Sequence, residues 1–223
     1  MRPEILFEDE DIIVIYKPAM VATESRSVTA QDCVSFLKNH RKNKGEEPYI
    51  GLIHRLDQPV EGILVFAKNK KSAAVLSKDM KEQNIKKEYL AIIPAGSIPR
   101  QGVLKDYLLK DASHGKAQIV PPGSTEGKEA ELMYESLGQI GDMEMLHIQL
   151  KTGRFHQIRC QLASRMVPII GDVKYGGAPT GKPLCLAAYH LSFLHPVSRK
   201  KMEFQVPPRG EKFEEFVRLD NDR

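Results

Sequence analysis

The chain has 223 residues, of which 41% are hydrophobic and 28% charged, and its formal net charge at pH 7 is +4. These totals are typical of a globular protein of one or two domains, and the charge favours a polyanionic partner only mildly. No apolar run approaches the roughly 20 residues that span a bilayer, and acidic residues follow the N-terminus at once, so we expect a cytoplasmic protein with no membrane partner.

The first half of the chain is predicted to contain strands and two helices. Thr29 and Asp32 have the spacing of a capping box, which predicts a helix start, and a continuous apolar run predicts a strand that is covered on both faces. The predicted elements are strands within 5–16 with a turn at 8–11, a helix at 29–38, a loop at 39–48, a strand at 62–67 and a helix at 72–80.

The second half is predicted to be richer in strands. Its predicted elements are a strand at 87–93, hairpins and exposed loops at 98–128, strands at 129–137 and 144–151, a helix with Phe155, Ile158, Leu162 and Met166 on its apolar face, strands at 184–194 and 201–206, and a short helix marked by Phe213, Phe216 and Val217. Many strands with few intervening helices favour an α+β fold on a mixed, mainly antiparallel central sheet with flanking helices and loops. No linker is visible, so we expect one domain over 1–223.

The three cysteines are expected to be reduced packing residues. Cys33, Cys160 and Cys185 are widely spaced and form no CxxC pair. An odd count without paired spacing argues against a disulfide framework and against a zinc knuckle. The chain also has no dinucleotide fingerprint and no P-loop, so we expect no cofactor and no metal.

The segment 53–62 places charged residues, Pro and Gly directly before the predicted buried strand. A loop that enters a rigid strand can hold a carboxylate firmly and leave it accessible. Asp57 is therefore a candidate catalytic residue. The alternative is a surface turn with an ion pair between Arg55 and Asp57, because loop acids that form ion pairs are common and mostly structural.

The segment 150–159 ends a strand at a Gly turn and begins a helix. Backbone N–H groups at such a junction, beside Arg154, His156 and Arg159, suit phosphate or another anion. Arg159 lies one turn after Phe155, where a partly buried guanidinium needs an acidic partner. An ordinary turn with solvated basic residues explains the spacing equally well, and Tyr89 within its apolar strand is by itself most simply a core residue.

Taken together, these segments resemble the RluA-type pseudouridine synthases. The resemblance rests on His-Arg-Leu-Asp at 54–57 with Gly62 and Ala67-Lys68, on Lys-Glu-Tyr-Leu-Ala at 87–91, on Thr-Gly-Arg-x-His-Gln-Ile-Arg at 152–159 followed by Gly171-Asp172, and on the stretch from Leu184 to Pro196. These motifs stand in the family's order over about residues 5–206. The resemblance implies the pseudouridine-synthase catalytic fold and, because so few residues precede Asp57, a catalytic domain without an N-terminal S4-like RNA-binding domain.

The resemblance implies an enzyme that isomerises uridine to pseudouridine in rRNA or tRNA, with no obligatory protein partner. Its catalytic residues would be Asp57 as the carboxylate, Arg159 as the cation beside it and Tyr89 against the uracil. The residues expected to bind substrate are Leu191 as an apolar wall, and His54, Arg55, Arg154 and His156 at the opening of the site or on phosphate. The alternatives are a non-catalytic RNA-binding protein or RNA chaperone of the same fold, and a hydrolase that uses Asp57 with the two histidines.

One position departs from the family pattern. The usual Thr-Ser before the Gly is replaced by Val60-Glu61, which adds a second carboxylate near Asp57. An inward carboxylate would oppose ionisation of Asp57, so we expect Glu61 to point outward. RNA affinity is expected from four basic segments, 38–44, 68–71, 86–87 and 199–201, because backbone phosphates dominate such binding.

Overall fold

The computed structural model describes residues 2–25, 31–179, 181 and 183–220, with the side chains of 217–220 left aside. The chain forms two compact units: unit 1 is Met1–Lys87 with Ala188–Pro207, and unit 2 is Glu88–Ala187 with Pro208–Arg223. The single domain expected from the sequence over residues 1–223 stays a prediction. No helix among the described residues is long and apolar enough to cross a membrane.

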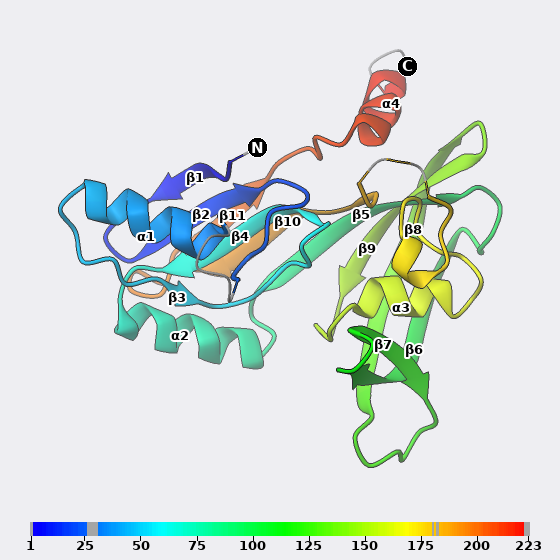
Figure 1. The fold of residues 1–223 in the computed structure, drawn as a ribbon, viewed down its shortest axis with the longest axis horizontal. Coiled ribbons are helices and arrows are strands. Elements are labelled where there is room, and N and C mark those ends of the chain that lie inside the picture. Colours follow the sequence, from blue (N-terminus) through cyan, green and yellow to red (C-terminus); the bar gives the residue numbers. More distant parts are fainter. Residues whose placement is uncertain (1, 26–30, 180, 182, 221–223) are drawn as a thin grey trace. The chain divides into compact units, whose positions relative to one another are not determined.

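Unit 1 is an antiparallel sheet with a helix on each side (Figure 1). Its strands are β1 (Glu4–Glu8), β2 (Ile12–Lys17), β3 (Gly51–Leu52), β4 (Glu61–Ala67), most of β10 (Leu186–Leu194) and β11 (Lys201–Gln205), and its helices are α1 (Cys33–Asn43) and α2 (Lys70–Lys81). Every residue of β2 and β4 is buried, as the apolar run predicted. Alternate residues of these strands pack against Leu76 of α2, so β4 is a rigid support for the loop that precedes it.

The helix α1 begins and ends later than predicted. Asp32 is its N-cap, because the Asp32 carboxylate accepts from the Ser35 amide at 2.7 Å, whereas Thr29 lies outside the described residues. The helix continues to Asn43, so the loop prediction for 39–43 was wrong. The cause is Arg41, whose buried guanidinium donates to the carbonyls of Tyr49 and Lys68 and so holds the end of α1 against the neighbouring backbone of unit 1.

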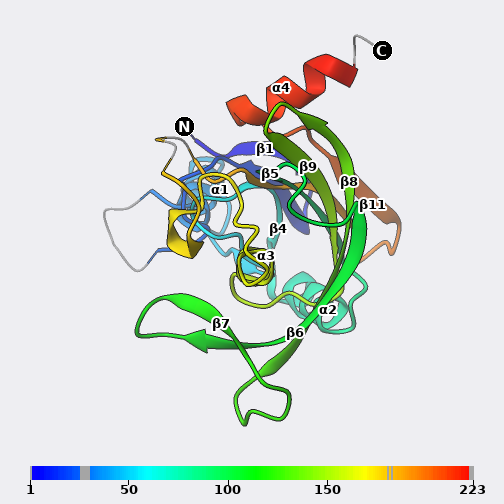
Figure 2. The ribbon, with the colours of Figure 1, turned by 90° about the vertical axis from the view of Figure 1, so that its right-hand side faces the viewer.

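Unit 2 is an antiparallel sheet in the order β5-β9-β8-β6-β7, with α3 beside the β6–β7 hairpin (Figures 1 and 2). The strands are β5 (Lys86–Pro94), β6 (Gln101–Asp111), β7 (Lys116–Val120), β8 (Lys128–Ile140) and β9 (Met143–Leu150), and the helices are α3 (Gln157–Ala163), the short 3-10 helix η1 (Val173–Tyr175) and α4 (Glu211–Asp220). The α+β class and the mainly antiparallel sheet are thus confirmed. The hairpin predicted within 98–128 is also present, with strands longer than expected.

The helix α3 is shorter than the apolar spacing from Phe155 to Met166 predicted. His156 has a left-handed backbone (φ 52°) and precedes the first turn, and Met166 is left-handed as well (φ 60°). The Val167 amide then donates to the Leu162 carbonyl at 3.1 Å, which closes the helix end. Phe155 and Met166 therefore lie outside the helix and are exposed at 38% and 89%.

Candidate active site

Asp57 lies half-buried on the loop between β3 and β4, and neighbouring contacts hold this loop in place. Thr23 exchanges two hydrogen bonds with the backbone of Leu56, donating to its carbonyl at 2.9 Å and accepting from its amide at 3.2 Å. The Val60 amide donates to the Asp57 carbonyl at 3.0 Å and closes a turn. Asp57 therefore comes directly before a fully buried strand on a backbone with little freedom.

Lys17, at the end of β2, is a cation near Asp57 that sequence reasoning missed. Its side chain is fully buried, and its ammonium donates to the carbonyls of Pro18, Val21 and Gln58 at 3.1, 2.7 and 3.0 Å. Burial lowers the pKa of Lys17 to about 8, although the charges of Asp57 and Glu61 act to raise it. The only sequence signal was a lysine set between an apolar strand and Pro18.

His54 joins the start of this loop to β4. The β3–β4 ladder ends at Leu52 and Phe66, and the next β4 amide, that of Val65, donates instead to His54 Nε2 at 3.2 Å. Burial, with a smaller contribution from the charge of Lys87, lowers the pKa of His54 to about 3. Because Nε2 accepts, the proton of this neutral ring sits on Nδ1, so His54 contributes hydrogen bonding rather than charge.

Glu61 points inward, which corrects the expectation that it faces solvent. Its side chain is buried at 5% exposure and accepts a hydrogen bond from the Tyr16 hydroxyl. The buried ammonium of Lys17 is close enough for the charge of Glu61 to affect its pKa. The burial of the Glu61 charge, where the loop departs from the family pattern, is thus compensated inside unit 1 by the Tyr16 hydroxyl and the Lys17 ammonium.

Arg55 is exposed and pairs with Glu24 at 3.0 Å. Within the described chain it forms no ion pair with Asp57, so the structural alternative considered for this loop is not supported. Gly62 is required here by a close approach. A Cβ at Gly62 would lie 2.2 Å from the Ala188 carbonyl oxygen of β10, and its φ of +132° is one that side chains avoid.

In unit 2, Arg159 has the acidic partner that its predicted burial required. Its Nε and a terminal nitrogen donate to the two Asp172 oxygens at 2.7 and 2.8 Å, and both side chains are buried. The guanidinium also lies 5.1 Å from the centre of the Tyr175 ring. Asp172 belongs to the Gly-Asp pair noted in the sequence, but only the fold shows that it is the partner of Arg159 in α3.

Polar groups at the junction before α3 form hydrogen bonds with one another. Gln157 Oε1 accepts from the Arg154 amide at 2.9 Å and from the Thr152 hydroxyl at 2.8 Å, and Arg154 Nε donates to the Glu129 carbonyl. The backbone N–H of Arg154 is therefore already bonded, which weakens the prediction of an anion site built on free amides. The exposed side chain of Arg154 remains a candidate for RNA contact.

Two further predicted site residues are buried. Tyr89 lies on β5 opposite Ile148 of β9, and Leu191 is 1% exposed within the core that includes Ile63 and Phe193. Packing alone accounts for the burial of Leu191. The roles of Tyr89 and Leu191 at a substrate base stay predictions.

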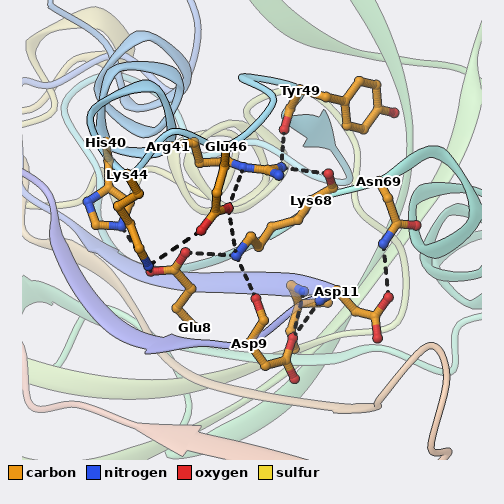
Figure 3. Close-up of polar contacts among 11 residues, drawn as sticks. Glu8, Asp9, Asp11, His40, Arg41, Lys44, Glu46, Tyr49, Lys68 and Asn69 are labelled. Carbon is orange, nitrogen blue, oxygen red and sulfur yellow. Dashed lines mark hydrogen bonds and ion pairs between the residues drawn. The ribbon is translucent and has the colours of Figure 1, made fainter.

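Three cations of the predicted basic segments 38–44 and 68–71 form ion pairs within unit 1 (Figure 3). Lys68 is buried and pairs with Glu8 at 2.9 Å and with Glu46 at 3.1 Å, while Arg41 contacts Glu46 at 3.2 Å. Lys44 is also paired with Glu8. Lys68, Arg41 and Lys44 therefore stabilise the fold, and the contribution of these two segments to RNA binding stays a prediction.

One group of ligand-type atoms occurs where no metal was expected. Asp9, Asp11 and His195 lie close together, but each is already hydrogen-bonded within the protein. His195 Nδ1 accepts from the amides of Val197 and Ser198, so its proton sits on Nε2, which donates to Asp9 at 2.9 Å. Asp11 accepts from Asn69 and Ser72. A protonated nitrogen does not bind a metal, and the group is explained by its own hydrogen bonds.

The chain is similar to known proteins over most of its length. Residues 11–164 match the family model described as RNA pseudouridylate synthase. The chain is 30% identical to ribosomal large subunit pseudouridine synthase D of Vibrio cholerae, over 98% of this chain and 71% of that protein. It is also 30% identical to the uncharacterized RNA pseudouridine synthase YhcT of Bacillus subtilis, over 92% of this chain and 68% of the relative.

A solved structure has the same fold. Human RNA pseudouridylate synthase domain containing 4 superposes with a TM-score of 0.76 over 92% of this chain and 89% of its own, at 23% identity. The family match covers most of the chain. This chain therefore belongs to the RNA pseudouridylate synthase family, as an RluA-type enzyme.

Proposed function

We propose that this pseudouridine synthase converts specific uridines of ribosomal or transfer RNA, with Asp57 as its catalytic carboxylate. The observation that carries the proposal is the environment of Asp57 in unit 1. Asp57 is half-buried on a loop held by Thr23 and Lys17, immediately before β4. The charge of Asp57 acts to raise the pKa of Lys17. A fixed nearby cation favours the ionised form of a carboxylate.

The reaction explains why an ionised carboxylate is needed. The bond from ribose C1′ to uracil N1 breaks, the base turns, C1′ bonds to C5, and the proton leaves C5, so the product is an isomer of the substrate. Asp57 either adds to C1′ or assists formation of a glycal, and both routes require its negative charge. The target uridine must also leave its stack, at a cost of roughly a few kcal/mol.

The remaining roles follow the family resemblance. Tyr89 packs on the uracil and takes part in removal of the C5 proton, and the resemblance gives Arg159 the role of the cation for the catalytic carboxylate. Leu191 is an apolar wall for the base. Arg55, Arg154 and His156 contact the RNA strand, and His54 orders the loop that carries Asp57.

Ribosomal RNA of the large subunit is the first substrate to test. The support is the printed name of several relatives at 30% identity, each called ribosomal large subunit pseudouridine synthase D. A cytoplasmic location accords with that substrate.

The test is a pseudouridine map of total RNA from the source organism with and without the gene, read by carbodiimide adducts and reverse-transcription stops. We expect a stop that is lost in the deletion and restored by the wild-type gene but not by Asp57→Asn. In single-turnover assays this variant should retain less than about 1% of the wild-type rate while binding RNA normally. Asp142→Asn, which changes an exposed carboxylate in the β8–β9 turn, is the matched control and should behave as wild type.

Residual turnover well above that level would remove Asp57 from the role of essential carboxylate. A map that is the same in both strains, combined with RNA binding but no product in vitro, would support the non-catalytic RNA-binding alternative. Release of free uracil would instead indicate a hydrolase.

A further inference from the structure

An exposed aromatic stack lies at the start of α3, where the sequence predicted a core residue. The Phe155 ring, 38% exposed, is stacked on the His156 ring with centroids 3.8 Å apart and planes 19° apart. The Lys110 ammonium of β6 lies 4.8 Å from the centre of the Phe155 ring. The partly exposed Phe155 thus stacks on His156, and the ammonium of an exposed lysine lies over its ring.

The ring beneath Phe155 is held firmly. His156 Nδ1 is 2.9 Å from the Tyr175 hydroxyl, and that hydroxyl accepts from the Ala117 amide at 2.6 Å. The Tyr175 hydroxyl thus joins His156 to the backbone of β7. Burial is the largest of the causes that lower the pKa of His156 to about 3. The left-handed backbone of His156 further restricts its position, and such backbone strain is often found at functional sites.

The charges around this stack are not neutralised by carboxylates. Within the part of the chain that the structure describes, four exposed cations near it form no ion pair: Lys110, Lys116, Lys174 and Arg154. Lys116 lies 6.0 Å from the centre of the Tyr175 ring, and the charges of Lys110 and Lys174 act on His156. By contrast, Lys105 and Lys151 in the same unit both pair with Glu131.

We infer that the stack of Phe155 on His156, with these four cations, binds one unpaired base of the RNA substrate other than the target uridine, together with its adjacent phosphates. The inference rests on the proposed function, since it names the part of the RNA that unit 2 holds. Every base has a π-face that stacks on an aromatic ring, and lysines beside the ring suit the phosphates on either side. Lys110 can leave the Phe155 face for a phosphate because its side chain is long and exposed.

The absence of tryptophan from the chain makes a direct test possible. Phe155→Trp introduces a single tryptophan at the stack, and stacking of a base on it should quench its fluorescence. The probes are a short oligouridine and a transcript of the large-subunit rRNA, and the quench should be half-maximal at the concentration that gives half-maximal retention of RNA on a filter. Leu137→Trp, at an exposed position of β8, is the matched control and should show no quench.

A second pair of variants should show a change in RNA affinity without a change in the single-turnover rate. Phe155→Leu keeps an apolar side chain but removes the π-face, and it should weaken RNA binding about 5- to 150-fold. Phe155→Tyr should bind within about twofold of wild type. At saturating RNA, the single-turnover rate of Phe155→Leu should stay close to that of wild type, because the residue binds RNA and takes no part in bond breaking. Thermal melting of each variant checks that the fold is intact.

Unchanged tryptophan fluorescence in a Phe155→Trp protein that binds RNA would overturn the inference, as would wild-type affinity in Phe155→Leu. Either result would leave the proposed function intact. A wild-type protein that neither binds nor modifies RNA would overturn the proposed function and the inference with it, and this would be seen before any variant is compared.

Discussion

At the scale of single residues, the candidate site depends on groups whose protonation is set by the fold. Burial lowers the pKa of both His54 and His156 to about 3, and in His54 the bond from the Val65 amide decides which nitrogen carries the proton. Lys17 differs from them, because burial brings its pKa to about 8, within reach of ordinary assay conditions. Its ammonium has three N–H groups, and all three are bonded to carbonyls, two in the segment after β2 and one, that of Gln58, in the loop that carries Asp57.

We therefore predict that activity falls as the pH rises through about 8. Deprotonation of Lys17 removes the charge that favours ionised Asp57 and one hydrogen bond that holds the loop. Stability should change in the opposite sense. Since the folded pKa lies below the ordinary value of 10.5, the buried charge costs stability at neutral pH, and this cost disappears as the pH rises from about 8 to above 10.5.

The measurement is a pH profile of kcat/KM for wild type and Lys17→Arg, with Lys17→Met for comparison. The arginine variant should lose the limb near pH 8, because a guanidinium stays protonated there, and Lys17→Met should be impaired at every pH. A limb that stays at the same pH in Lys17→Arg would assign it to another group, such as the uracil itself.

At the scale of elements, an ion-pair network joins β1, α1 and the end of β4 (Figure 3). Glu8 accepts from Lys68, His40 and Lys44, with distances of 2.9, 2.9 and 3.2 Å. Burial alone would raise the pKa of Glu8, but these hydrogen bonds outweigh it and lower the pKa to about 2. The network therefore explains why α1 extends through a basic stretch that by itself resembles a loop.

We predict that Glu8→Gln destabilises the protein by about 1 kcal/mol at pH 7, allowing for solvent screening. The folded pKa of Glu8 is below its ordinary value of 4.5, so its contribution is complete above pH 4.5 and is lost as the pH falls towards 2. Urea unfolding at pH 7 and near pH 3 should show the difference between variant and wild type shrinking in acid.

The control for this network is Glu203→Gln, which removes an exposed carboxylate paired with Lys201 on β11 and should change stability little. A difference between Glu8→Gln and wild type that is the same at both pH values would show that packing, and not the charge of Glu8, accounts for the loss.

Across the whole molecule, whose net charge is +4, the cations are of two kinds, those paired with carboxylates and those without such a partner among the described residues. Some of them, such as Lys68 and Arg199, are paired with carboxylates and stabilise the fold. Others, such as Lys110 and Lys116 near the Phe155 stack, have no such partner among the described residues. Only the second kind can release counterions from RNA phosphates at full effect.

We expect RNA affinity to fall steeply with salt, and the slope to identify the contributing cations. Lys116→Gln should reduce the slope of log K against log salt by about 0.7, the value for one phosphate contact on a single strand. Lys105→Gln removes a cation that is already paired with Glu131 and should leave the slope unchanged. Equal slopes for the two variants would remove Lys116 from the RNA contacts. Filter binding of oligouridine at several salt concentrations gives both values.

The sequence by itself determined the elements whose signals are local. The buried run of β4, the strands of the β8–β9 hairpin and the α+β class follow from the periodicity of apolar residues, which needs no knowledge of partners. The family followed from ordered motifs, of which His-Arg-Leu-Asp at 54–57 and Thr-Gly-Arg-x-His-Gln-Ile-Arg at 152–159 are the most specific.

The tertiary structure decided what each charged or aromatic side chain meets. Glu61 and Lys17 both lie inside unit 1, although the charge of Glu61 near Asp57 led us to expect that it points outward. Phe155 lies outside α3, although its apolar spacing predicted a core position on that helix. The physical reason is that a charge can be buried only where the fold supplies its partner, and the partners come from distant parts of the chain. Tyr16 lies 45 residues from Glu61, and Gln58 lies 41 residues from Lys17, so no local pattern could reveal either pairing.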